Sequence, residues 1–117
     1  TSAALIAEVT ASILQRLAKL DVTQRNAVLG TYHLVADGQT TWYGFARAIM
    51  ARAVDAGLLA DAPHVDAIDS AQFATRAQRP AYSVLDTTRL RQTFGMNLPP
   101  WQVSLDRVIA EMAAAKP

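Results

Sequence analysis

Apolar residues recur every three or four positions at the start of the chain, as they do along one face of an α-helix. This spacing predicts an amphipathic helix over about the first twenty residues. Its apolar positions are Leu5, Ile6, Val9, Ile13, Leu14, Leu17 and Leu20. Thr1 or Ser2 is suited to cap the helix N-terminus. The polar stretch at positions 21–26 is expected to be a break without regular structure.

A second pattern follows at positions 31–36, where β-branched and aromatic residues precede an Asp-Gly turn signal. The apolar residues do not alternate with polar ones, which favours a strand covered on both faces, as in a parallel sheet. Thr40 or Thr41 then begins a second amphipathic helix. Gly57 is placed to end that helix in a left-handed conformation.

The second half of the chain predicts two more short strands, near 65–68 and 82–85. Asp86 is a good helix N-cap, so a short helix is expected over about 87–94, followed by a glycine stop. A Pro-Pro pair then leads into a last amphipathic helix. Because strands and helices alternate, we expect a helix-rich α/β fold.

Length, hydrophobic content, net charge and cysteine content exclude several classes of protein. The 117 residues are 51% hydrophobic, which is enough for a core, and the length suggests one domain over residues 1–117. The net charge of +1 argues against a basic stripe for nucleic acid or a membrane-surface patch. The chain contains no cysteine, so we expect a cytoplasmic protein without disulfides. A helix cap at the first residue suggests that a further segment precedes it.

Arg79 is the residue with the most suggestive local setting. Pro80 biases it toward an extended backbone, and Asp86 marks a helix start shortly afterwards. A guanidinium presents a planar, permanently charged fork that matches a phosphate group. The competing interpretation is an ordinary surface ion pair, which the local sequence alone favours.

Other catalytic or metal-binding patterns are not found in the sequence. The five glycines are too scattered for a dinucleotide loop or a P-loop, and no serine occupies a nucleophile elbow. His33 and His64 lack metal-ligand spacing, and His33 is expected to lie in a core or cleft wall. Trp42 and Trp101 are each able to stack on a ligand base, but both begin helices, where core packing is favoured. We therefore expect no catalytic, cofactor-binding or metal-binding residue.

Three blocks of sequence, taken together, resemble the dTDP-4-dehydrorhamnose reductase family. The first block covers 30–46 and contains Gly-Thr-Tyr-His-Leu-Val-Ala and Thr-Thr-Trp-Tyr. The second covers 78–90 and contains Gln-Arg-Pro-Ala-Tyr-Ser-Val-Leu-Asp-Thr, and the third covers 94–101 with Phe-Gly, Leu-Pro and Trp. Their order and spacing match, so the resemblance extends over essentially the whole chain.

The resemblance implies an NAD(P)H-dependent enzyme that reduces dTDP-4-dehydro-L-rhamnose to dTDP-L-rhamnose for cell-surface polysaccharides. Its fold would be an N-terminal Rossmann domain followed by a smaller substrate-binding lobe, and this chain resembles only that C-terminal lobe. The family's glycine-rich loop and its Tyr-x-x-x-Lys pair have no counterpart here. By the resemblance, this piece binds the nucleotide-sugar and is inactive alone.

The resemblance also implies roles for individual residues. Arg79 would face the diphosphate of a dTDP-sugar. Tyr82 and Ser83 either line the nucleotide side of the cleft or only pack and cap. Some family members form homodimers around a magnesium ion held by glutamates, for which Glu111 and, in an uncertain register, Glu8 are the candidates.

Two alternatives from other functional classes stay open. One is a non-catalytic regulatory subunit of the same fold group, such as the regulatory β subunit of methionine adenosyltransferase. The other is a free-standing helical interaction module. The strand expected at 31–36 weighs against a free-standing module, because a lone strand leaves its amide groups unpaired.

Overall fold

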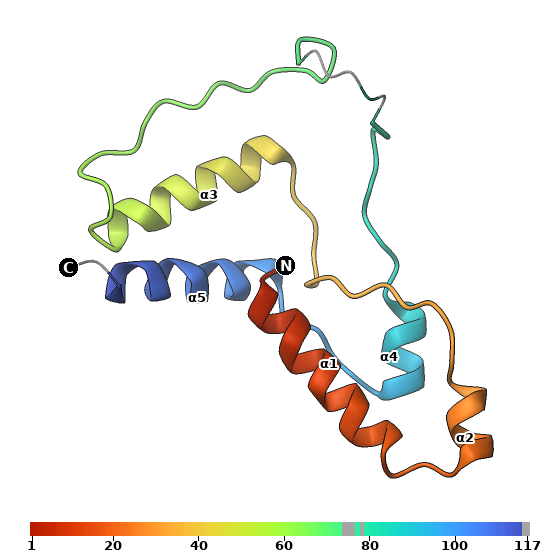
Figure 1. Ribbon diagram of the computed structural model, residues 1–117. Coiled ribbons are helices and arrows are strands. Elements are labelled where there is room, and N and C mark those ends of the chain that lie inside the picture. Colours follow the sequence, from red (N-terminus) through yellow and green to blue (C-terminus); the bar gives the residue numbers. More distant parts are fainter. Residues whose placement is uncertain (74–76, 78, 116–117) are drawn as a thin grey trace. The chain divides into compact units, whose positions relative to one another are not determined.

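The structure is a computed structural model that describes residues 1–73, 77 and 79–115 (Figure 1). Its helices are α1 (Ala3–Leu17), α2 (Val22–Ala27), α3 (Trp42–Asp55), α4 (Thr88–Phe94) and α5 (Trp101–Ala114). The chain divides into two compact units. Unit 1 comprises Thr1–Asp37 and Leu85–Ser104, and unit 2 comprises Gly38–Val84 and Leu105–Pro117.

Unit 1 has a small core made by α1, α4 and the chain around them. Leu90 of α4 is its most deeply buried residue, with only 1% of its surface exposed. The buried members of the core are Leu5, Val9, Ala36, Leu90, Phe94 and Leu98. The rings of Tyr32 and Phe94 meet at a centroid distance of 5.2 Å. The apolar stripe predicted for the first helix therefore faces a core, as expected.

Helix ends in unit 1 follow local signals in the sequence. The Ser2 hydroxyl accepts a hydrogen bond from the Leu5 N–H at 3.2 Å, which confirms one of the two predicted caps of α1. Gly95 ends α4 with a left-handed φ of 57°. The break expected at 21–26 is wrong, because a reciprocal capping box between Asp21 and Gln24 begins α2 there.

The strand expected at 31–36 is absent from the described residues, and the reason is the lack of a partner strand. The segment belongs to no helix or strand, and two of its backbone groups bond to side chains instead. The Ala36 N–H donates to the Thr1 hydroxyl at 3.0 Å, and the Arg89 guanidinium donates to the Thr31 carbonyl at 3.1 Å. An extended segment becomes a strand only when a neighbour completes the ladder.

The strands expected near 65–68 and 82–85 are also wrong. Neither segment pairs with another part of the described chain, and most of their residues are exposed. Among the described residues, β-type pairing is limited to one parallel bridge between Asp37 and Pro100. There the Asp37 N–H donates to the Pro99 carbonyl at 2.8 Å, and the Asp37 carbonyl accepts from the Trp101 N–H at 2.9 Å. The described chain is thus helix-rich, and the β part of the expected α/β fold is not found in it.

Unit 2 is built on α3 and on α5 after its first turn. The Thr41 hydroxyl caps α3 by accepting from the Gly44 N–H at 3.0 Å, as one of the two predicted caps. Arg52 of α3 donates a hydrogen bond to Asp106 of α5, which ties the two helices together. Leu105 and Ile109 of α5 are buried. None of the helices in the described part of the chain is long and apolar enough to span a membrane.

Candidate functional site

Arg79 lies in unit 2, on an exposed stretch of chain that belongs to no helix. Pro80 follows it directly. Among residues 1–73, 77 and 79–115, no ion pair involves the Arg79 guanidinium. The surface ion pair favoured by local sequence is therefore not found within the described chain. The guanidinium fork is open to solvent, where an anionic ligand can reach it.

Tyr82 and Ser83 continue the same exposed stretch. Tyr82 has 71% of its surface exposed, so it does not fill a core. Its hydroxyl donates to the Gln39 side-chain oxygen at 3.4 Å. This contact brings the segment that follows Arg79 beside the loop leading into α3, two parts of unit 2 that are far apart in sequence (Figure 1).

Gln39 is not among the residues that the sequence predicts to bind a ligand. A glutamine in a loop has no local signature, because its importance here comes from a contact 43 residues away. The only indirect signal was its position between the Asp-Gly turn and the helix cap at Thr41. Together, Arg79, Tyr82 and Gln39 present a cation, a phenol and an amide on the surface of one unit.

Asp86 belongs to unit 1 and has a structural role in the described chain. It was expected to be the N-cap of the following helix, but the N-cap is Thr87. Hydrogen bonds from the Thr88 hydroxyl and backbone N–H lower the pKa of the Asp86 carboxyl, and nearby His33 adds to this effect. His33 Nδ1 lies 3.2 Å from the Asp86 carbonyl, so the nitrogen must carry a proton to donate there.

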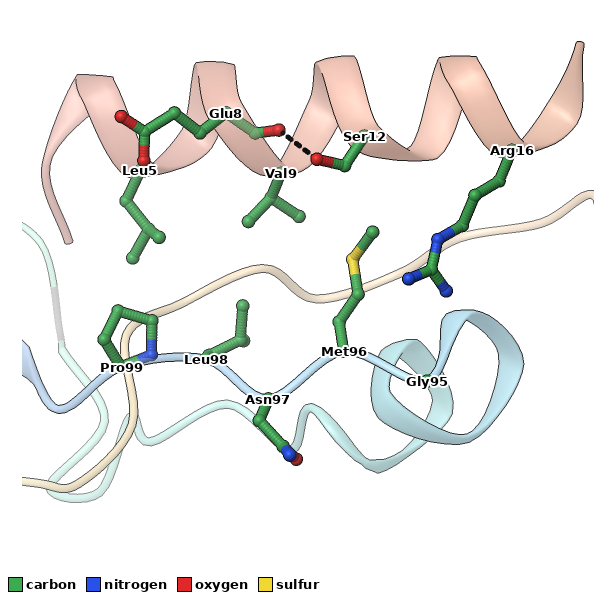
Figure 2. Close-up of a pocket in the computed structure, with 10 residues that line it drawn as sticks. All are labelled: Leu5, Glu8, Val9, Ser12, Arg16, Gly95, Met96, Asn97, Leu98 and Pro99. Atoms are coloured by element: carbon green, nitrogen blue, oxygen red, sulfur yellow. Dashed lines mark hydrogen bonds between the residues drawn. The ribbon is translucent and has the colours of Figure 1, made fainter.

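A pocket of about 230 Å³ opens in unit 1 between α1 and the loop after α4 (Figure 2). Leu5, Val9 and Leu98 give it an apolar wall, and Arg16 extends toward its other end near Gly95 (Figure 2). Its remaining lining residues are Glu8, Ser12, Met96, Asn97 and Pro99. None of the residues predicted to bind substrate lines this pocket.

The two glutamates considered for magnesium lie on different helices of different units. Glu8 is on α1, where its backbone carbonyl accepts from the Ser12 hydroxyl at 2.9 Å. The carboxylate of Glu111, on α5, lies 3.0 Å from the Arg107 Nε and is engaged by that cation. The described residues contain no cluster of three or more acidic, histidine or cysteine side chains able to hold a metal ion.

The exposed groups around Arg79 suit binding rather than bond-breaking chemistry. A guanidinium, a phenol, a hydroxyl and an amide can hold phosphate oxygens and the polar edges of a sugar or base.

Comparison with known proteins agrees with a binding role. The family model described as the RmlD substrate binding domain matches residues 1–114. The dTDP-4-dehydrorhamnose reductase of Escherichia coli K12 is 37% identical over 113 residues, which is 96% of this chain and 36% of that protein. The enzyme of the same name from Aggregatibacter actinomycetemcomitans is 37% identical over 100 residues, covering 86% of this chain and 34% of that protein.

The same name is carried by the relative from Salmonella typhimurium, which is 34% identical over 112 residues. This chain thus spans about a third of the length of the curated relatives it matches. No solved structure matches the chain with significance. The family match extends from residue 1 to residue 114, so the chain belongs to the RmlD substrate-binding-domain family.

Proposed function

We propose that this chain is the part of a dTDP-4-dehydrorhamnose reductase that binds the nucleotide-sugar. The complete enzyme would reduce dTDP-4-dehydro-L-rhamnose to dTDP-L-rhamnose, for cell-surface polysaccharides. The observation that carries the proposal is the similarity to reductases of that name, which covers 96% of this chain in the Escherichia coli enzyme. The family description, a substrate-binding domain, supports assigning this part to binding.

In this proposal Arg79 binds the diphosphate, and Tyr82 and Ser83 contact the nucleotide side of the ligand. All three residues are exposed in unit 2. The Arg79 guanidinium has no ion-pair partner within the described residues, which leaves its donors available. Contacts remote from the reacting carbon set the pose of a large substrate, and such positioning lowers the barrier to the reaction.

The hydride for the proposed reaction would come from NAD(P)H, and the described residues do not fit that cofactor. The glycines of this chain form no dinucleotide-binding loop, which requires closely spaced glycines before a helix. We therefore assign the cofactor and the proton donor to a Rossmann domain outside this chain. The function proposed for residues 1–117 as one domain is to bind and orient the substrate.

A homodimer bridged by magnesium and a cytoplasmic location belong to the same proposal. Glu8 and Glu111 are the carboxylates this chain could contribute to such an ion. The Arg107 contact with Glu111 would have to be released or shared, because that cation now lies against the carboxylate. Oxygen ligands of this kind suit Mg²⁺.

Binding of dTDP to the intact protein and to Arg79 variants, measured by titration calorimetry, tests the proposal. A lost charge-assisted contact to phosphate is worth about 1.5–3 kcal/mol, so Arg79→Gln should weaken dTDP binding roughly 10- to 100-fold. Arg79→Lys should give an intermediate Kd, because lysine keeps the charge but loses the planar fork.

The matched control is Lys19→Gln, which removes an equal charge from an exposed position of unit 1 and should leave the Kd unchanged. Equal dTDP affinities for Arg79→Gln and the parent protein would refute the role of Arg79. A parent protein that does not bind dTDP would refute the proposed function as a whole.

A further inference from the structure

The two tryptophans of this chain have different environments. Trp101 begins α5, is half-buried and packs against the core of unit 1, as expected. Trp42 begins α3, but 80% of its surface is exposed, so the expectation that it packs in a core is wrong for the described chain. An aromatic side chain buries 150–250 Å² when it is covered. An exposed tryptophan therefore offers a large apolar face to a ligand.

The contact between Tyr82 and Gln39 joins the segment that carries Arg79 to the loop that leads to Trp42. Gln39 is three residues before Trp42, and Arg79 is three residues before Tyr82. Successive Cα atoms are 3.8 Å apart, so each of these steps spans at most about 11 Å. Trp42, Tyr82 and Arg79 thus lie in neighbouring segments of unit 2.

These residues offer aromatic rings for stacking and a cation for phosphate binding, and one kind of ligand can use both. Tyr82, with 71% of its surface exposed, adds a second accessible aromatic ring to that of Trp42. Nucleobases stack on aromatic side chains because every base has a π-face. A guanidinium binds phosphate. A ligand with a planar base joined through a sugar to a phosphate chain is a nucleotide.

We propose that Trp42 stacks on the nucleobase of a nucleoside diphosphate whose phosphates are bound by Arg79. The Gln39 amide, held beside this region by its contact with Tyr82, is available to hydrogen-bond the edge of the base. This inference rests on the proposed function and deepens it, because it assigns the recognition of the base to a residue of α3. Trp42 acts by stacking, so its ring and not its N–H carries the effect.

The test compares two ligands and two substitutions in the intact protein, by titration calorimetry. The ligands are dTDP, which has a base, and inorganic pyrophosphate, which has none. Trp42→Leu should weaken dTDP binding roughly tenfold, because stacking is worth about 1–3 kcal/mol per base, and should leave pyrophosphate binding unchanged. Trp42→Phe keeps a ring and should bind dTDP within a few-fold of the parent protein.

Fluorescence gives a second measurement that does not depend on the leucine variant. Because the fluorescence of an exposed tryptophan is quenched by a stacked base, dTDP should quench the fluorescence of the parent protein more than that of Trp42→Phe. Pyrophosphate should quench neither protein.

The outcomes separate this inference from the proposed function. If Trp42→Leu binds dTDP with the affinity of the parent protein while Arg79→Gln binds it more weakly, this inference is overturned and the proposed function is kept. If Trp42→Leu weakens dTDP and pyrophosphate binding equally, base stacking is likewise overturned, because the effect would then lie with the phosphates. If the parent protein binds no dTDP, both the stacking role of Trp42 and the proposed function are refuted.

Discussion

Gly30 and Arg89 together hold the extended segment of unit 1 in place. The Arg89 guanidinium donates to the carbonyls of Thr31 at 3.1 Å and Leu29 at 3.2 Å, and it lies 4.6 Å from the centre of the Tyr32 ring. Gly30 has a φ of 147°. A Cβ atom at this glycine would lie 2.9 Å from the Arg89 Cζ and closer still to Nη2. Gly30→Ala should therefore both strain the backbone and displace the guanidinium.

The expected loss of stability has two parts. A non-glycine residue with this positive φ costs about 1–3 kcal/mol. Two charge-assisted hydrogen bonds would ordinarily contribute about 1.5–3 kcal/mol each, but Arg89 is exposed, so we expect only about 1–2 kcal/mol for the pair of bonds. Because the displaced group is the end of a flexible side chain, it can move away instead of clashing. Gly30→Ala should thus destabilise unit 1 by about 2–5 kcal/mol.

A double-mutant cycle separates these parts. Urea unfolding followed by circular dichroism would be measured for Gly30→Ala, Arg89→Met and the double variant. Methionine keeps an apolar stem over Tyr32 but removes the donors. Because Gly30→Ala already displaces the guanidinium, the double variant should be about 1–2 kcal/mol more stable than the sum of the single effects predicts.

Gly95→Ala is the control, since Gly95 also has a positive φ, of 57°, and belongs to unit 1. A Cβ there would meet Arg16 Nη1 at an ordinary 3.7 Å, so this variant should show backbone strain alone. Effects of Gly30→Ala and Arg89→Met that add to within about 0.5 kcal/mol would refute the coupling between the two residues.

Two further predictions concern unit 1. Hydrogen bonds from Thr88 lower the pKa of Asp86 below its ordinary value of 3.8, so ionised Asp86 stabilises the fold above that pH and this contribution is lost as the pH falls through the lowered pKa. An NMR titration should find the carboxyl midpoint lower in the folded protein than in an unfolded peptide and raised by Thr88→Val; equal midpoints would contradict it. The backbone N–H groups of 31–35 make no hydrogen bond within the described residues, so in this chain they should exchange with solvent faster than the α4 amides. Protection equal to that of α4 would show that the segment does pair.

Features of the fold that depend on nearby residues could be predicted from sequence. The cap of α1 at Ser2, the cap of α3 at Thr41 and the left-handed stop at Gly95 each depend on residues within one or two turns. The capping box of α2 was also readable, from an aspartate followed three residues later by a glutamine. The segment has no apolar stripe, so the hydrophobic pattern alone does not indicate a helix there.

The predicted strands failed because strand formation depends on a partner. The residues at 31–36 have the composition of a buried strand, but the chain there forms no regular element. What the composition cannot specify is whether another extended segment lies alongside it. In the described chain, the side chains of Thr1 and Arg89 bond to this segment instead. The same dependence on distant neighbours explains the failure at 65–68 and 82–85.

The candidate site shows the same division between local and distant information. Arg79 could be singled out because the proline after it and the charge it carries are local features. Gln39 could not, because its contact with Tyr82 joins residues 43 positions apart. The exposure of Trp42 could not be predicted, because a tryptophan at the start of an amphipathic helix has the same local sequence whether its ring is buried or exposed. The structure separates these two cases, since 80% of the Trp42 surface is exposed. Exposure makes the ring accessible to a ligand, and the base-stacking role proposed for Trp42 starts from that observation.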